Sequence, residues 1–468
     1  MKTQTFTLVA VLSLAGCAVG PNYRRPDMHP PPAFRAPEPL PPQSASIADL
    51  KWFEVFNDPE LQNLVRTALE RNYDLRDAVS RVEASRAILG VTRSSQYPNF
   101  GAGASVEINR LSRDGATPIR NQVLPSQNRN FGTAALELLS FEIDIWGRLR
   151  RETEAARANL LGAEETRKAV VTTLVSDVAT AYFTLRQLDY ALEISQRTLQ
   201  TREQSLELIR SRQTGGVATL LEQRQAEQLV QTAAETIPAI QEQIELTENR
   251  ISLLLGQHPG SVLRGRSLTN QNMPPEVPVG LPSALLERRP DIGAAEHDLI
   301  AASAEIGVAR AAYFPRLTLS GALGGASTQL SSLFSADHSS WNLAPEVTQP
   351  IFTAGRIKSG VKFAEARRES ALIRYEKTVQ TAFTEVSDAL IAHQRLRERR
   401  EKEAALVATL EDRVRLAYVR YRGGVDTQLN ALDSDRDLFQ AQLDLARIRL
   451  EELLAVVQLY KALGGGWQ

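Results

Sequence analysis

Two carboxylates near the C-terminal end of the chain have a spacing that could act on charged solutes. Asp426 and Asp433 lie seven residues apart in a segment with helical periodicity, so both side chains lie on one side of the helix, two turns apart. Repeated around a symmetry axis, one inward aspartate per chain becomes a ring of like charges that attracts cations and repels anions. Mutual repulsion in such a ring raises the carboxylate pKa, which would make a gate sensitive to pH.

Both aspartates also have simpler interpretations. Asp426 precedes Thr427 and a helical segment, a place where aspartate commonly caps a helix N-terminus. Asp433 is followed by Asp435 and Asp437, and the three carboxylates together would form a solvated acidic face. The sequence alone leaves these alternatives open.

The N-terminus carries an export signal. Lys2 is followed by a short apolar run, residues 6–14, and by small residues up to Cys17, which is the order of a signal peptide. The run is too short to span a bilayer as a mature helix. The segment resembles a bacterial lipobox, which would make Cys17 the lipidated first residue of the mature protein. Ala18 in the next position then implies sorting to the outer membrane. A plain signal peptide with an incidental cysteine is the alternative.

The composition excludes several other chemistries. Cys17 is the only cysteine, so the chain cannot build an intrachain disulfide, a cysteine zinc cluster or a Cys/His nucleophile pair. The net charge of -1 gives no electrostatic reason to expect nucleic-acid binding. No catalytic constellation is visible, so we expect no enzyme, no metal and no cofactor, apart from a covalent diacylglycerol and N-acyl lipid on Cys17.

The second half of the chain repeats the first. With an offset of 208, Gly423-Gly424-Val425 falls on Gly215-Gly216-Val217. Nearer the start of each half the offset is 217, and Gly307-Val308 matches Gly90-Val91. One structural unit therefore occurs twice, with its length difference confined to a loop-like region.

Apolar periodicity and turn residues predict the same order of elements in both halves: helix, strand, loop, strand, long helix, glycine turn and return helix. In the first half these are a helix over 59–96, strands over 100–108 and 131–145, a long helix over 148–213 and a return helix over 219–255, disturbed at Pro238. In the second half they cover 283–313, 316–322, 341–352, 356–422 and 428–463. Each long helix would be roughly 100 Å long, which favours a coiled coil or a helical tube.

These elements predict five segments. They are a signal peptide over 1–16, a lipidated proline-rich tether over 17–58, a first repeat over 59–255, a crossover over 256–282 and a second repeat over 283–468. No segment after Cys17 is apolar for about 18 residues, so we expect no transmembrane helix. Four strands cannot close a barrel alone, and an open sheet edge is untenable in lipid. Membrane insertion would therefore need strands from several chains.

Five motifs are specific enough to compare with a known family. They are GCAVGPNY (16–23), DIWGR (144–148), LPSALLERRPDI (281–292), YRGGVD (421–426) and YKALGGGW (460–467). Together they resemble the TolC-like outer-membrane channel family, in its lipoprotein, OprM-like branch that serves RND multidrug efflux. The resemblance covers essentially the whole chain. It implies a mainly helical trimer in which four strands per chain close a twelve-stranded β-barrel in the outer membrane. The long helices would form a periplasmic tunnel, encircled by a belt made of the tether and residues 256–282.

The resemblance also implies roles for residues near the turns. In that family a leucine and an aspartate one turn apart form the periplasmic constriction, and the matching residues are Leu429 and Asp433. Tyr421, Arg422 and Asp426 match positions that latch the inner helix pair against its neighbours. TolC has a second acid where this chain has Asn430, which is a departure from the pattern. The helical tips, where a periplasmic adaptor would dock, are the turns at Gly215, Gly216, Gly423 and Gly424.

The function predicted from this resemblance is a passive exit duct of a tripartite efflux pump. It would conduct drugs, dyes and detergents from an inner-membrane RND transporter, through the adaptor, to the exterior of a Gram-negative cell. A duct for type I protein secretion or for metal efflux is the alternative with the same architecture. A lipid-anchored structural coiled coil is a third possibility, and the paired strands at matched places in both halves speak against it.

Overall fold

The computed structural model describes residues 18–37, 46–110, 128–271 and 278–467. The predicted signal peptide and the predicted lipidation site at Cys17 lie outside these residues. The described chain is mainly helical with one antiparallel four-stranded sheet, and the same order of helices and strands occurs twice. The predicted fold class, a mainly α chain with an internal duplication and four strands, is therefore confirmed.

The chain divides into two compact units, and both repeats contribute to each. The first unit contains Met1–Pro26, Val82–Gly162 and Ala295–Tyr375, and the second contains Asp27–Arg81, Ala163–Ala294 and Glu376–Gln468. The long helices α5 (Arg148–Thr214) and α9 (Arg356–Arg422) supply residues to both units. Both are 67 residues long; α9 has the predicted bounds, and α5 ends one residue later than predicted. Among the described helices, none combines the length and the apolar character needed to cross a membrane.

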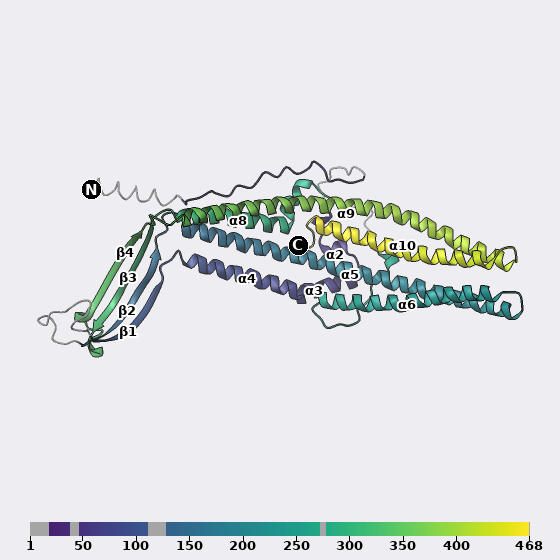
Figure 1. The fold of residues 1–468 in the computed structure, drawn as a ribbon, viewed down its shortest axis with the longest axis horizontal. Helices are drawn as coiled ribbons and strands as arrows, with labels where there is room; N and C mark the ends of the chain where they lie inside the picture. Colours follow the sequence, from purple (N-terminus) through teal and green to yellow (C-terminus); the bar gives the residue numbers. More distant parts are fainter. Residues whose placement is uncertain (1–17, 38–45, 111–127, 272–277, 468) are drawn as a thin grey trace. The chain divides into compact units, whose positions relative to one another are not determined.

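The first unit holds the sheet (Figure 1). Its strands are β1 (Phe100–Arg110), β2 (Asn128–Glu142), β3 (Arg316–Ser327) and β4 (Ser339–Thr348), hydrogen-bonded in that order. The β2–β3 pair joins the two repeats. β1 and β4 are edges that no other described strand pairs, so each presents free backbone hydrogen-bonding groups to a further partner.

The two faces of the sheet differ in polarity, because successive side chains point to opposite faces. The register aligns Leu136, Leu323 and Trp341 in one row, and all three side chains are exposed in the single chain. On the opposite face Ser105 and Thr133 oppose each other, with their hydroxyl oxygens 2.8 Å apart. One face is thus an extended apolar surface, of a kind that marks a membrane or protein contact.

The predicted strand ends needed correction. β2 ends at Glu142 and β4 at Thr348, earlier than predicted, whereas β3 continues to Ser327. β2 stops early because the chain turns into α5 there: Ile145 N donates to the carbonyl oxygen of Ile143 at 2.9 Å.

The first predicted helix of each repeat is in fact divided. In the first repeat, α3 (Pro59–Arg71) and α4 (Tyr73–Ser94) are separated by Asn72. The Asn72 side chain accepts a hydrogen bond from Leu75 N and donates one to the carbonyl oxygen of Leu254, so it caps two helices instead of continuing one.

The second repeat breaks at the matching position. The predicted helix over 283–313 consists of η4 (Pro282–Ala284), α7 (Leu285–Arg288) and α8 (Pro290–Ala311). Arg289, which separates α7 from α8, is extended, because the residue before a proline disfavours the helical conformation.

The second unit contains the two glycine turns. α6 (Leu220–Leu254) returns from α5, and α10 (Gln428–Ala462) returns from α9 (Figure 1). Apolar residues join the helices of each pair. They are Leu206, Ile209, Ala226 and Val230 between α5 and α6, and Val407, Leu410, Ala441 and Leu445 between α9 and α10. α6 continues through Pro238, where we predicted a disturbance, and buried positions occur on both sides of the proline.

A buried carboxylate fixes the crossover within the same unit. Asp58 accepts hydrogen bonds from the Tyr182 hydroxyl at 2.8 Å and from Arg266 N at 3.0 Å. A β-carbon on Gly265 would lie 2.2 Å from the Asp58 carboxylate, so only glycine fits at this position of the crossover. This cluster sets the position of the crossover against α5.

Candidate functional site: the helical turns and the foot of the sheet

The two turns share one backbone motif. Gly216 and Gly424 have φ values of +74° and +72°, and an added β-carbon at either would meet no neighbour within 4 Å in the described chain. Glycine is therefore required here for its left-handed conformation and not for space. Val217 N and Val425 N each donate back to a carbonyl five residues earlier, which is the usual way a helix C-terminus is closed before a turn.

Asp426 organises the second turn. Its Oδ2 accepts from Arg420 Nε at 3.1 Å, and its Oδ1 accepts from Thr427 N at 2.8 Å and from Asn430 Nδ2 at 2.6 Å. The N-cap of α10 is Thr427, so the interpretation of Asp426 as the cap itself is wrong by one residue. The donated hydrogen bond from Asn430, the pairing with Arg420 and the Thr427 amide lower the pKa of Asp426. Within one chain its pKa is therefore lowered, opposite to the rise that a ring of aspartates would produce.

The three predicted latch residues lie close together but have different surroundings. Tyr421 is buried, and the Arg212 guanidinium of α5 lies 4.8 Å from its ring centroid, so this residue links α9 to α5. Burial raises the pKa of Tyr421, which keeps its hydroxyl protonated. Arg422 is exposed. Asp426 is bound within its own turn.

The two predicted constriction residues are accessible in the single chain. Leu429 has 49% of its surface exposed, which is unusual for a leucine in a packed helix pair. Asp433 lies one turn further along α10, and its carboxylate contacts Arg436 Nη1 at 3.3 Å. Both side chains are thus free to face a lumen or another chain.

A buried ion pair near the turns was not among the predicted site residues. Asp435 accepts from Arg202 Nε at 2.7 Å, and both side chains are buried. Arg202 also donates to the carbonyl oxygen of Leu229 at 2.9 Å and lies 4.9 Å from the Phe439 ring. Asp435 is therefore not part of a solvated acidic face. The signal was its position two residues after Asp433, which turns it to the other side of the helix.

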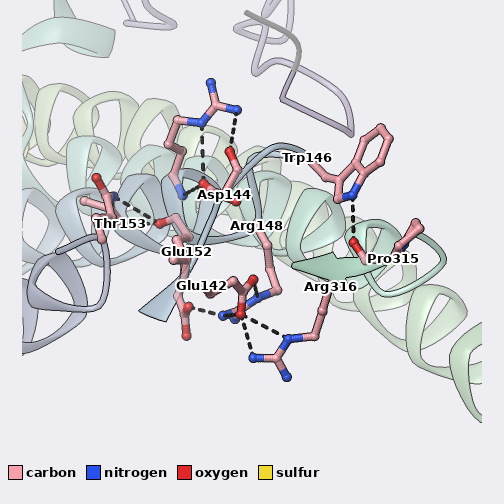
Figure 2. A network of polar contacts seen from close by, with 11 residues as sticks. Glu142, Asp144, Trp146, Arg148, Glu152, Thr153, Pro315 and Arg316 are labelled. Carbon is pink, nitrogen blue, oxygen red and sulfur yellow. Dashed lines mark hydrogen bonds and ion pairs between the residues drawn. The ribbon is translucent and has the colours of Figure 1, made fainter. Parts of the chain in front are cut away.

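We call the region where β2 ends, β3 begins and α5 starts the foot of the sheet. It carries a second polar network, from Glu142 to Arg150 and at Arg316 (Figure 2). Glu142 accepts a bidentate pair from Arg148, at 2.8 and 2.9 Å, and a further bond from Arg316 at 2.6 Å. Trp146 Nε1 donates to the carbonyl oxygen of Pro315 at 2.8 Å, and its ring stacks on Phe314 with centroids 4.7 Å apart. The motif around residues 144–148 thus ties the end of β2 to the start of β3 and α5.

Asp144 completes this foot by capping α5. Its carboxylate accepts from Arg150 N at 2.9 Å, which satisfies a backbone donor in the first turn of the helix. The sheet and the helix are therefore joined by fixed polar contacts and not by a loose loop.

An internally duplicated chain with one two-faced sheet, two very long helices and paired glycine turns defines an outer-membrane channel subunit. The family model described as "Outer membrane efflux protein" matches residues 64–257 and 281–465, one segment in each repeat, and the chain belongs to this family.

Relatives cover the whole chain. The chain is 37% identical to the toluene efflux pump outer membrane protein TtgF of Pseudomonas putida over 100% of its own length and 98% of the relative. It is 36% identical to the outer membrane protein OprJ of Pseudomonas aeruginosa, covering 98% and 95% of the two chains. Among solved structures, the open state of the Neisseria gonorrhoeae MtrE outer membrane channel has a TM-score of 0.87 at 32% identity, over 97% and 99% of the chains. The protein is an outer-membrane component of an efflux system.

Proposed function

We propose that the protein is the exit duct of a tripartite efflux pump and works as a trimer. Three copies would pair the free edges of β1 and β4, turn the apolar face of each sheet to the lipid and enclose a twelve-stranded barrel. The long helices would continue this conduit into the periplasm. The observation that carries the proposal is the family match over both repeats.

The duct would act passively and without catalysis. It would receive its cargo from an inner-membrane RND transporter through a periplasmic adaptor docked at the turns around Gly215, Gly216, Gly423 and Gly424. TtgF is named for toluene efflux, and we propose small apolar toxicants as the cargo, including organic solvents, drugs, dyes and detergents. Cys17 would carry the diacylglycerol and N-acyl lipid that anchor the mature N-terminus.

The periplasmic end would be closed by α10. Leu429 and Asp433 are accessible in the single chain, which supports a constriction formed by three copies of each around the axis. Tyr421, Arg422 and Asp426 would hold α9 and α10 in the closed position. Opening would then move this pair while α5 and α6 stay in place.

Accumulation of a fluorescent dye and susceptibility to toluene, drugs, detergents and copper would be measured in a deletion strain. The strain is complemented with wild type or with Cys17→Ser. Higher retention of chemically diverse compounds, reversed by wild type, is the expected result. Normal retention of every small compound, together with loss of a secreted protein, would replace the efflux duct by a secretion duct. Sensitivity confined to copper would replace it by a metal-efflux duct.

A further inference from the structure

The segment that follows the predicted lipidation site is held in a built seat in the first unit. We define the strap as Ala18–Arg25 and the seat as the residues of α5, α8 and the turn before α5 that bind it. Val19 N donates to the carbonyl oxygen of Trp146 at 2.9 Å. The buried Arg151 of α5 donates to the carbonyl oxygens of Val19 and Gly20, and to Asn22 Oδ1 at 2.6 Å. Most of these contacts involve main-chain atoms of the strap. They therefore fix the path of its backbone and not only the positions of its side chains.

Three glycines let the strap approach the seat closely. A β-carbon on Gly307 of α8 would lie 2.6 Å from the Val19 carbonyl oxygen, and one on Gly147 would lie 2.6 Å from the Ala18 side chain. Gly20 has a φ of +104°, and its β-carbon would lie 2.5 Å from the Gly307 backbone. No larger residue fits at these positions without moving the strap.

The other end of the strap is fixed on the same helix. Tyr23 donates to the Glu296 carboxylate at 3.0 Å, and Arg25 pairs with its other oxygen at 3.0 Å. Glu296 and Gly307 are eleven residues apart on α8, about 16 Å along the helix axis. An extended segment of four to five residues spans about the same distance, so the strap is long enough to run along α8 between the two fixed points.

The first repeat contains a position equivalent to Gly307, which allows the two glycines to be compared. Gly307 matches Gly90 of α4 under the offset of 217, but a β-carbon on Gly90 would meet no neighbouring atom of the described chain within 4 Å. One copy of the same glycine therefore lies under the strap and the other lies in open space.

We propose that this seat positions the acylated N-terminus at the foot of the sheet, so that the lipid enters the membrane in register with the four strands. Residue 17 is one peptide bond before Ala18, and Ala18 is held against Gly147, where β2 passes into α5. The seat residues Arg151 and Gly307 are thus positioning residues for membrane insertion of the sheet. This inference rests on the proposed lipidation and trimeric insertion.

Gly307→Ala is the test variant, because its methyl group displaces the strap while alanine favours the helix that carries it. Gly90→Ala is the matched control at the repeat-equivalent position. Arg151→Gln is a second, independent variant, with Arg310→Gln as its control, since Arg310 forms an exposed ion pair with Glu365. Each full-length variant is made with Cys17 intact and with Cys17→Ser.

Three quantities are measured in cells: incorporation of an alkyne-labelled palmitate, the urea-resistant membrane fraction, and crosslinked trimer within that fraction. With Cys17 intact, Gly307→Ala and Arg151→Gln should both keep the palmitate label. Arg151→Gln should reduce inserted trimer by about tenfold, the factor expected for loss of a charge-assisted hydrogen bond. Gly307→Ala should reduce inserted trimer in the same direction, because its methyl group displaces the strap. Both controls should match wild type. In the Cys17→Ser background, where there is no lipid to position, the same two variants should change insertion less than about twofold.

The variants and the two Cys17 backgrounds distinguish the ways in which the inference could be wrong. An equal loss in both backgrounds would overturn the inference, because the seat would then be an ordinary structural contact. Unchanged insertion of acylated Gly307→Ala would also overturn it, provided that trypsin cleaves the purified variant after Arg24 faster than wild type, which shows that the strap has been released. If cleavage is unchanged as well, the seat does not depend on close approach at Gly307, and the inference fails on its structural premise. Absence of palmitate label from wild type would refute the lipidation itself, whatever the seat does.

Discussion

The two glycine turns have the same backbone but are closed by different electrostatics. In the first repeat Thr219 and Glu222 form a reciprocal capping box: the Thr219 hydroxyl accepts from Glu222 N, and the Glu222 carboxylate accepts from Thr219 N at 2.6 Å. In the second repeat Asn430 replaces that glutamate, and the carboxylate comes from Asp426 on the other side of Thr427. Duplication thus preserved the fold of the turn, while divergence moved its negative charge from inside the helix to the turn itself.

The same divergence recurs one helical turn further in. Asp435 and Glu227 are equivalent under the offset of 208, yet Asp435 is buried with Arg202, whereas Glu227 binds Gln223, Arg224 and Arg210 near the surface. Hydrogen bonds from Gln223 and Arg224 lower the pKa of Glu227 to about 2. In addition to its apolar contacts, the first helix pair is joined by a charged contact near the surface, from Arg210 of α5 to Glu227 of α6. At the equivalent position the second helix pair is joined to α5 by a buried ion pair.

The largest effect should come from breaking the buried pair. Asp435→Ala leaves the buried Arg202 charge without its carboxylate partner, which typically costs about 3–5 kcal/mol of folding free energy. Glu227→Ala removes only a network near the surface, so its cost should be much smaller than that of Asp435→Ala. Urea unfolding of the purified protein, followed by circular dichroism, would compare the two. Similar midpoints for both variants would mean that the Asp435–Arg202 pair is hydrated in solution.

The next effect concerns closure of the duct. Asp426→Ala combined with Asp433→Ala removes the contact of the turn with Arg420 and both candidate charge rings, so resting conductance in planar bilayers should rise. The rise should be severalfold and not larger, because the contact between Asp426 and Arg420 lies at the surface and is screened by solvent. Cation selectivity should fall in the same recording. The double variant Ala218→Asp with Gln225→Asp, at the equivalent sites of the first repeat, is the control. Unchanged conductance and selectivity in the Asp426/Asp433 variant would remove these residues from the gate.

A smaller difference is expected at the two N-caps. Thr219→Ala removes a side-chain cap and should lower the free energy of unfolding by about 1 kcal/mol. Thr427→Ala should change it by no more than a few tenths, because the Thr427 side chain makes no capping hydrogen bond. Equal losses in urea unfolding would show that the second turn forms a conventional cap in solution.

These comparisons also show what the sequence could predict. The long helices and their turns were predictable because their signals are local: a proline-free run that begins at Arg148 or Arg356 and ends before a glycine pair. The break at Arg289 was equally local, since Pro290 follows it, but the predicted helix ran through it. The break at Asn72 depends on a hydrogen bond to Leu254, which no local pattern reveals.

In the candidate site, too, the features set by local spacing could be predicted, and those set by distant contacts could not. The positions of Leu429 and Asp433 on one side of α10 follow from helical spacing, and both are accessible as that spacing suggests. The burial of Asp435 does not follow from it, because its partner Arg202 lies 233 residues away in the sequence. Contacts between distant helices, and the charges they neutralise, were the part that required the structure.

The smallest expected effect is a flat response to pH. Asn430, Arg420 and the Thr427 amide lower the pKa of Asp426 below its ordinary value of 3.8. A group with a lowered folded-state pKa contributes its full stabilisation above the ordinary pKa, and loses it only as the pH falls through the lowered value. The turn should therefore stay closed by this contact between about pH 5 and pH 8, and bilayer conductance should be constant there. Repulsion within a trimeric ring acts in the opposite direction and would raise the pKa. A conductance transition between pH 5 and pH 8 that Asp426→Asn abolishes would show that the ring outweighs the contacts within each chain. A constant conductance would show that each aspartate is controlled by its own turn.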